Sequence, residues 1–121
     1  MATDRFTTFI TLPWPPKELN PNFKRRKHWT QYQPQTKQYR HDCFWLTEKQ
    51  LDRKIDVEGK LPLTIEFYPP DRRNRDDDGM IGAFKAGRDG MADAIGINDN
   101  LFKPSYVICD PVKGGKVIVR I

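Results

Sequence analysis

Three arginines run directly into three aspartates in the segment from Arg72 to Asp78. Arginine side chains suit phosphate groups and carboxylates suit a hard cation, so this segment could lie where a polyanion meets a metal ion. Lys85 follows within an expected helix, and Asp99 comes just beyond that helix, in the run Asn98–Asn100. The spacing of these groups indicates metal-dependent chemistry on a phosphate-rich substrate.

The positions of the aspartates indicate which of them could share a metal ion. In an extended chain residues i and i+2 point the same way, so Asp76 and Asp78 would face one side and Asp77 the other. Asp99 returns after one helix and could close the site. Three neighbouring carboxylates repel one another unless a cation is present, and Mg²⁺ prefers such oxygen ligands. Asp76, Asp78 and Asp99 are therefore the candidate metal ligands for phosphodiester hydrolysis.

A lysine is spaced so that it could join the same site. Lys85 lies seven residues after Asp78. At about 100° per residue, that spacing brings the two side chains to within ~20° of the same helix face. The ammonium group could then neutralise a phosphate or stabilise charge in the transition state.

Simpler structural roles remain open for the same residues. Asp77 or Asp78 could cap the free N–H groups of a helix, with the arginines as their ion-pair partners. Asp99 could belong to an ordinary Asn-Asp-Asn turn, and Lys85 could be a solvated surface lysine. The residues alone do not decide between these roles and a metal site.

Two basic clusters could bind the phosphates of DNA, in keeping with a net charge of +5 and a pI near 9.3. The first cluster lies in an expected loop, where Trp29 or Tyr32 could stack on exposed bases. A solvated loop whose aromatic side chains enter the core is the alternative. The candidate phosphate contacts are Lys24, Arg25, Arg26, Lys27, Arg72, Arg73 and Arg75.

Six elements are expected to position these groups within one small domain spanning residues 1–121. Apolar periodicity predicts helices over about 35–54 and 78–95. Alternation and β-branched residues predict strands at 6–12, 61–68, 105–110 and 116–121, with the last two joined by a turn at Gly114-Gly115. The resulting β-α-β-α-β-β order predicts an α/β (α+β) fold with a mixed sheet and two main helices. Glycines in the second helix indicate close approach of another backbone.

Several expected absences narrow the class of protein. Cys43 and Cys109 lack metal-ligand spacing, which argues against a zinc site or a disulfide scaffold and favours two buried thiols. No apolar run approaches the length of a membrane span, and the N-terminus lacks a signal-peptide core. We therefore expect a soluble cytoplasmic protein with no membrane partner. Trp14 and Trp45 are expected in the core or in a dimer contact.

Several motifs, in their order along nearly the whole chain, resemble the RusA-type Holliday-junction resolvases, small endonucleases common in bacteriophages and prophages. The central resemblance is the segment Arg72–Asp78. Gly79 departs from the family pattern, which has Asn after the second aspartate, and Gly82 stands where the best-known members have a lysine. The other matching segments are Thr11–Pro16 with Asn20, Phe84–Gly87, Asp89–Ala94, Asn98–Asp99 and Lys113–Gly115.

The resemblance implies a RusA-like fold and a homodimer that resolves four-way DNA junctions by paired, symmetric cuts, in DNA recombination and repair. Mg²⁺ would be the cofactor, with Mn²⁺ able to substitute. Asp76, Asp78 and Asp99 would be catalytic metal ligands, Lys85 the catalytic lysine and Arg75 a DNA contact. The expected location is the cytoplasm of a bacterial cell, from a phage or prophage gene.

Two other functions stay open at this point. The chain could be a non-catalytic dimer that only binds branched DNA, or a nuclease that prefers forks or flaps. Metal-dependent cleavage would separate the first from a resolvase, and a panel of branched substrates would separate the second.

Overall fold

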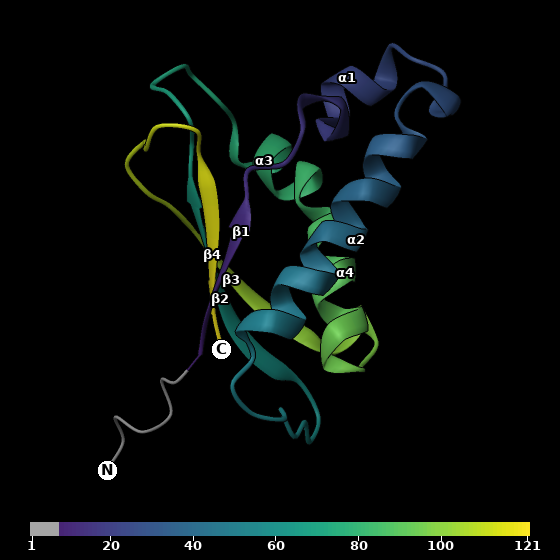
Figure 1. The fold of residues 1–121 in the computed structure, drawn as a ribbon. Helices are drawn as coiled ribbons and strands as arrows, with labels where there is room; N and C mark the ends of the chain where they lie inside the picture. The colour runs from purple at the N-terminus through teal and green to yellow at the C-terminus, as the bar shows by residue number, and fades with distance from the viewer. Residues whose placement is uncertain (1–7) are drawn as a thin grey trace.

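The computed structural model describes residues 8–121 and shows a four-stranded sheet with helices packed on it (Figure 1). Residues 6 and 7 of the expected first strand lie outside the described residues. Three short 3₁₀ turns, η2 (Lys17–Leu19), η3 (Trp29–Gln31) and η4 (Asp99–Leu101), connect the main elements. The main elements are β1 (Phe9–Pro13), α1 (Pro21–Arg25), α2 (Gln33–Gln50), β2 (Leu61–Tyr68), α3 (Asp77–Ala83), α4 (Lys85–Ile95), β3 (Phe102–Ile108) and β4 (Lys116–Arg120).

The sheet is mixed, as the sequence predicted. Its strand order is β1-β4-β2-β3, with β4 antiparallel to both β1 and β2, and β3 parallel to β2. A parallel pair needs a long crossover, and α3 and α4 supply it. Because β2 lies between β3 and β4, the last two strands are not paired neighbours. The chain between them turns at Gly114 and Gly115, both at positive φ.

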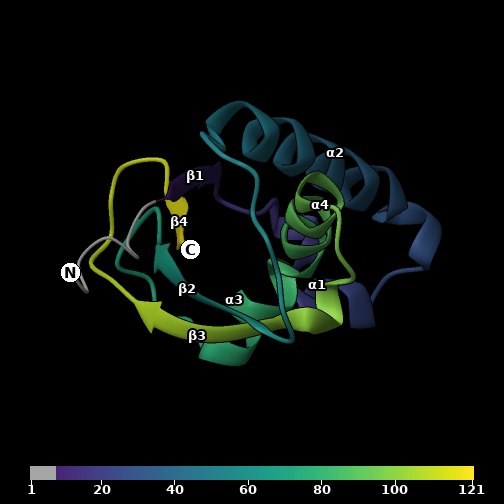
Figure 2. The ribbon, with the colours of Figure 1, turned by 90° about the horizontal axis from the view of Figure 1, so that it is seen from below.

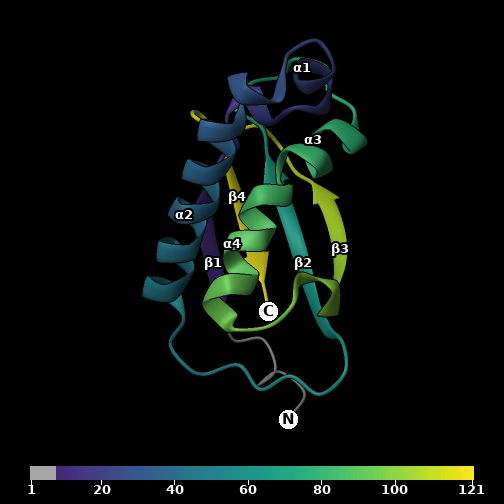
Figure 3. The same cartoon turned by 90° about the vertical axis from the view of Figure 1, so that its right-hand side faces the viewer.

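Helices α2 and α4 cover the same face of the sheet (Figures 2 and 3). The inward residues of the strands alternate, as in Ile10 and Leu12, and share one core with Met91 of α4 and with Phe84, which lies between α3 and α4. Cys43 is buried in this core, and burial raises the pKa of its thiol to about 12, so the thiol stays protonated. Cys109 is only half-buried, contrary to expectation.

The packing of α2 on α4 depends on a glycine. A Cβ added to Gly90 would lie 2.3 Å from the carbonyl oxygen of Arg40 and 3.0 Å from the backbone nitrogen of Phe44. The expected close approach of another backbone therefore occurs within the fold. Arg40 also makes two hydrogen bonds to Asp93, at 2.8 and 2.9 Å, which join the same two helices.

The expected helix over residues 78–95 is two helices, which is a correction to the sequence analysis. Phe84 separates them, and its buried ring packs edge-to-face on Tyr39 and Phe67. This long-range packing fixes the break, which local periodicity could not indicate. α4 then ends as expected at Gly96, which has a φ of 87° and supplies the left-handed cap.

The first long helix is shorter than expected because Gln50 turns towards the sheet. Its side chain accepts a hydrogen bond from the N–H of Thr11 at 2.7 Å and donates one to the carbonyl oxygen of Thr11 at 2.9 Å. The amide thus satisfies the free edge of β1 and ends the helix before residue 54. No helix among residues 8–121 is long and apolar enough to cross a membrane.

Candidate functional site

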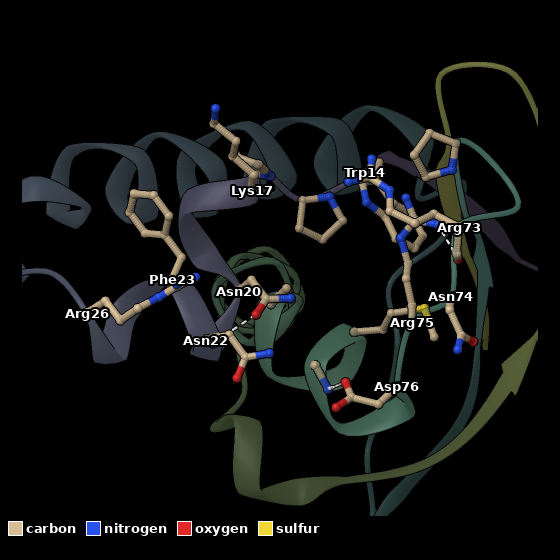
Figure 4. Close-up of a pocket in the computed structure, with 16 residues that line it drawn as sticks. Trp14, Lys17, Asn20, Asn22, Phe23, Arg26, Arg73, Asn74, Arg75 and Asp76 are labelled. Carbon is tan, nitrogen blue, oxygen red and sulfur yellow. Dashed lines mark hydrogen bonds between the residues drawn. The ribbon is translucent and has the colours of Figure 1, made fainter.

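A cleft of about 560 Å³ lies between the N-terminal segment and the arginine-rich segment before α3. Its lining includes four cations, Lys17, Arg26, Arg73 and Arg75, and one carboxylate, Asp76. Figure 4 shows Lys17 and Arg26 on one side of the group of lining residues and Arg73, Arg75 and Asp76 on the other. The cleft therefore combines positive charge with a single acidic group, which suits a phosphate-containing ligand.

The cleft exists because α1 and α3 meet at one end of the sheet (Figures 1 and 3). Asn20 caps α1 by accepting a hydrogen bond from the N–H of Asn22 at 2.8 Å, and Pro21 occupies the first helical position. Pro21 in turn packs over Gly82 of α3, where an added Cβ would lie 2.6 Å from the proline ring. This contact holds the N-terminal segment against the site.

Asp71 holds two of the arginines at the rim of the cleft. Its carboxylate accepts hydrogen bonds from the N–H of Arg73 at 2.9 Å and from the Arg73 side chain at 3.3 Å, and it pairs with Arg75 at 2.9 Å. The hydrogen bond from Arg75 is the main reason that the pKa of Asp71 lies well below its usual range. Arg75 also lies 5.8 Å over the ring of Trp14. Arg72 is exposed to solvent beside this group.

The three aspartates occupy the start of α3 rather than an extended strand. Asp76 is the N-cap, and its Oδ1 accepts a hydrogen bond from the N–H of Gly79 at 2.8 Å. Asp77 and Asp78 are exposed in the first helical turn. The expectation that Asp76 and Asp78 face one side as in an extended chain is therefore wrong, because the helix begins at Asp77. The capping role considered for Asp77 or Asp78 belongs to Asp76.

Lys85 lies at the start of α4 and is held between two carboxylates. Its Nζ is 2.6 Å from Asp89 Oδ1 and 2.7 Å from Asp99 Oδ2. Partial burial disfavours the ammonium, but the hydrogen bonds to Asp89 and Asp99 outweigh this effect and raise the pKa of Lys85. The hydrogen bond from Lys85 is also the main reason that the pKa of Asp99 is lowered. Lys85 is thus a fixed cation beside Asp99.

The break at Phe84 changes the expected relation between Lys85 and Asp78. The predicted shared face assumed one continuous helix, and the two residues belong to different helices. Among residues 8–121, no three aspartate, glutamate, histidine or cysteine side chains are placed together to hold a metal ion. The oxygen donors of Asp76, Asp78 and Asp99 are of the kind that Mg²⁺ takes, but they do not converge in this arrangement. Their role as metal ligands stays a prediction.

Comparison with known proteins decides the family. The sequence model of the family described as Endodeoxyribonuclease RusA matches residues 13–121, nearly the whole chain. This chain belongs to the RusA endodeoxyribonuclease family. An uncharacterized protein of Xylella fastidiosa strain Temecula1 is 43% identical over 115 residues, which cover 93% of this chain and 74% of that protein.

Within this RusA-family chain, the basic run Lys24–Lys27 is not the open loop that we expected. It spans the end of α1, and Arg26 lines the cleft. Lys24 lies 5.2 Å over the ring of Tyr32. Trp29 in η3 is exposed rather than buried in the core, and its stacking on bases stays a prediction. A DNA-binding role for the whole run stays a prediction.

Several residues that line the cleft were not assigned to a site from the sequence. Trp14 was expected in the core or at a dimer contact, but it both packs edge-to-face on Phe67 and lines the cleft. Trp45 was also expected in the core or at a dimer contact, but it is 53% exposed on α2, outside the cleft. The pair Asn20-Pro21 could have predicted α1, and with it this side of the cleft, because Asn followed by Pro is a typical start of a helix. The other polar or aromatic lining residues that were missed are Lys17, Asn22, Phe23 and Asn74.

Proposed function

We propose that this RusA-family protein resolves four-way DNA junctions by paired, symmetric strand cuts. The observation that carries the proposal is the basic cleft with Asp76 at its edge, in a chain that matches the RusA family over residues 13–121. The four cations of the cleft suit DNA phosphates. The protein would act in DNA recombination and repair. It would be encoded by a phage or prophage gene and work in the bacterial cytoplasm.

The proposed roles of the residues follow from their charges and contacts. Arg26, Arg73 and Arg75 would position the phosphate backbone along the cleft. Lys85 would stabilise charge on a phosphate oxygen, because its hydrogen bonds keep it charged and restrict its direction. Asp76 would act at the reacting phosphate next to the cleft.

Mg²⁺ is the proposed cofactor, with Mn²⁺ able to substitute. The proposal rests on the chemistry of the donors Asp76, Asp78 and Asp99, since carboxylate oxygens are the ligands that Mg²⁺ prefers. These side chains would have to come closer together than they lie in the described structure.

A homodimer is proposed because two symmetric cuts need two equivalent sites, and one chain would supply one of them. A two-fold axis would present two identical sites to two strands of like polarity. Each chain of the dimer would then cut one of the two strands.

A panel of labelled DNA substrates tests the proposal against its alternatives. The panel contains a four-way junction, a fork, a flap and a linear duplex, each at the same concentration with Mg²⁺. We expect paired cuts at symmetry-related positions of the junction and little cutting of the duplex. Preferred cutting of forks or flaps would favour a nuclease for other branched DNA. Tight binding of the junction without cuts in Mg²⁺ or Mn²⁺ would leave a non-catalytic DNA-binding dimer.

A further inference from the structure

We propose that the cleft beside Asp76 takes one unstacked nucleotide of the bound DNA, with its base inside the cleft and its flanking phosphates on the cations at the rim. The inference rests on the proposed function, because it assumes that DNA is the ligand of this cleft. It adds a recognition site for a nucleobase to a surface otherwise assigned to phosphates.

The walls of the cleft are more apolar than phosphate binding requires. The indole of Trp14 and the phenyl ring of Phe23 line it together with the rings of Pro15, Pro16 and Pro70. Both aromatic rings are only half-buried, and a cation lies over each of them, Arg75 over Trp14 and Lys27 over Phe23, so a base would stack on the other face of a ring or take the place of the cation. A planar base can cover such surfaces by stacking, and a phosphate cannot.

Three side-chain amides, Asn20, Asn22 and Asn74, also line the cleft. The side-chain oxygen of Asn20 caps α1. Its Nδ2 lies close to Gly79, because a Cβ added to that glycine would be 3.4 Å from this nitrogen and would also contact Asp76. Asn22 uses its oxygen to accept a hydrogen bond from Arg25. Among the described contacts, the NH₂ groups of Asn20 and Asn22 donate to no protein atom. Amides of this kind pair with the edges of bases.

The size and position of the cleft fit one nucleotide. Its volume of about 560 Å³ falls within the ~300–1,000 Å³ typical of small-ligand sites. Lys17 and Arg26 lie at its N-terminal side and Arg73 and Arg75 at the other, so phosphates on both sides of the base could be held (Figure 4).

A base can enter this cleft only after it has left the helical stack. Extruding a base costs a few kcal/mol and least where pairing is already disturbed. A branch point interrupts the continuous stack of the duplex, which lowers the unstacking part of this cost, so the cleft would favour branched over linear DNA. The preference would then come from the cleft itself, in addition to any dimer geometry.

A binding cycle with an abasic nucleotide tests the inference. The nucleotides on either side of the mapped cut in a four-way junction are replaced, one at a time, by an abasic residue. Affinity is measured by fluorescence anisotropy with EDTA, for the wild type and for Phe23→Ala. In the wild type, loss of one particular base should weaken binding at least about fivefold, the lower end of what base–aromatic stacking contributes. In Phe23→Ala, loss of the same base should have almost no further effect.

Matched variants distinguish loss of base stacking from a general loss of folding or DNA binding. Phe23→Tyr keeps the ring and should restore the effect of the missing base. Trp45→Ala removes an exposed aromatic ring from α2, outside the cleft, and should behave as the wild type. Equal affinity for intact and abasic junctions at every position, or additive effects in Phe23→Ala, would overturn the inference while leaving the proposed cleavage intact. Failure to bind the intact junction would instead reject the proposed function, and this inference with it.

Discussion

At the residue scale, Lys85 is held by hydrogen bonds to Asp89 and Asp99, and none of these three residues lines the basic cleft. The Nζ of Lys85 lies 2.7 Å from Asp99 Oδ2, so the positive charge of the lysine is held beside that carboxylate. The Lys85 side chain is 54% exposed, so its ion pair with Asp99 contributes little to the free energy of folding. The main effect of the pair is to fix the position of the ammonium group. Of the three predicted acidic residues, Asp76, Asp78 and Asp99, only Asp99 is hydrogen-bonded to Lys85.

Replacing Lys85 with Met should raise the pKa of Asp99 towards its ordinary value. Because the folded-state pKa of Asp99 is lowered, the stability that the pair contributes is present above the unfolded pKa and is lost as pH falls through the folded value. A carbon-detected NMR titration of the Asp99 carboxyl group measures the shift, with Lys49→Met as the control. We also expect roughly 100-fold slower junction cleavage, as for loss of other charge-stabilising groups. An unchanged Asp99 titration would refute the assignment.

At the element scale, the basic run Lys24–Lys27 spans the end of α1, and its proposed DNA contacts would contribute to the salt dependence of DNA binding. Removing one cation that binds a phosphate should reduce the slope of log affinity against log salt by about 0.9. Arg26→Ala removes one such cation from each chain of the proposed homodimer and should flatten the slope by about 1.8, whereas Lys49→Ala at the far end of α2 should not. Equal slopes for the wild type and Arg26→Ala would remove α1 from the DNA surface.

The contact between α2 and α4 predicts a contrast between two glycines. A Cβ on Gly90 would meet the rigid backbone of Arg40 at 2.3 Å, whereas one on Gly87 would meet the ring edges of Phe84 and Tyr39 at 2.7 and 2.9 Å. Overpacking of this kind typically costs ~1–3 kcal/mol, partly offset by ~1 kcal/mol of helix propensity. Gly90→Ala should therefore lower the thermal midpoint more than Gly87→Ala. Equal midpoints in thermal unfolding would contradict this account of the interface.

The elements also show what sequence could and could not predict. The strands followed from alternation, as in Leu63, Ile65 and Phe67, because one face of the sheet meets the helices. The break at Phe84 depends on rings from distant elements, so no local pattern could reveal it. The acidic site was predicted as a set of residues, but its geometry was not, because a helix begins at Asp77 directly after the extended Asp76, and because Phe84 separates α3 from α4.

At the scale of the whole molecule, the proposed symmetric reaction predicts a dimer. Sedimentation equilibrium should give twice the chain mass of 14.2 kDa at the concentrations at which junctions are cut. A mass of one chain under those conditions, together with paired cuts, would contradict the two-fold arrangement and require each chain to cut twice.

The central claim is that the site at Asp76 cuts four-way junctions, and one variant tests it most directly. Asn caps a helix about as well as Asp, so Asp76→Asn should keep α3 and junction binding while it removes the carboxylate charge. The measurement is cleavage of a labelled four-way junction in Mg²⁺ by the wild type and by this variant, with binding followed in parallel. We predict paired, symmetry-related cuts by the wild type and none by Asp76→Asn at undiminished affinity. Undiminished cutting by Asp76→Asn, or no cutting by the wild type, would contradict the account.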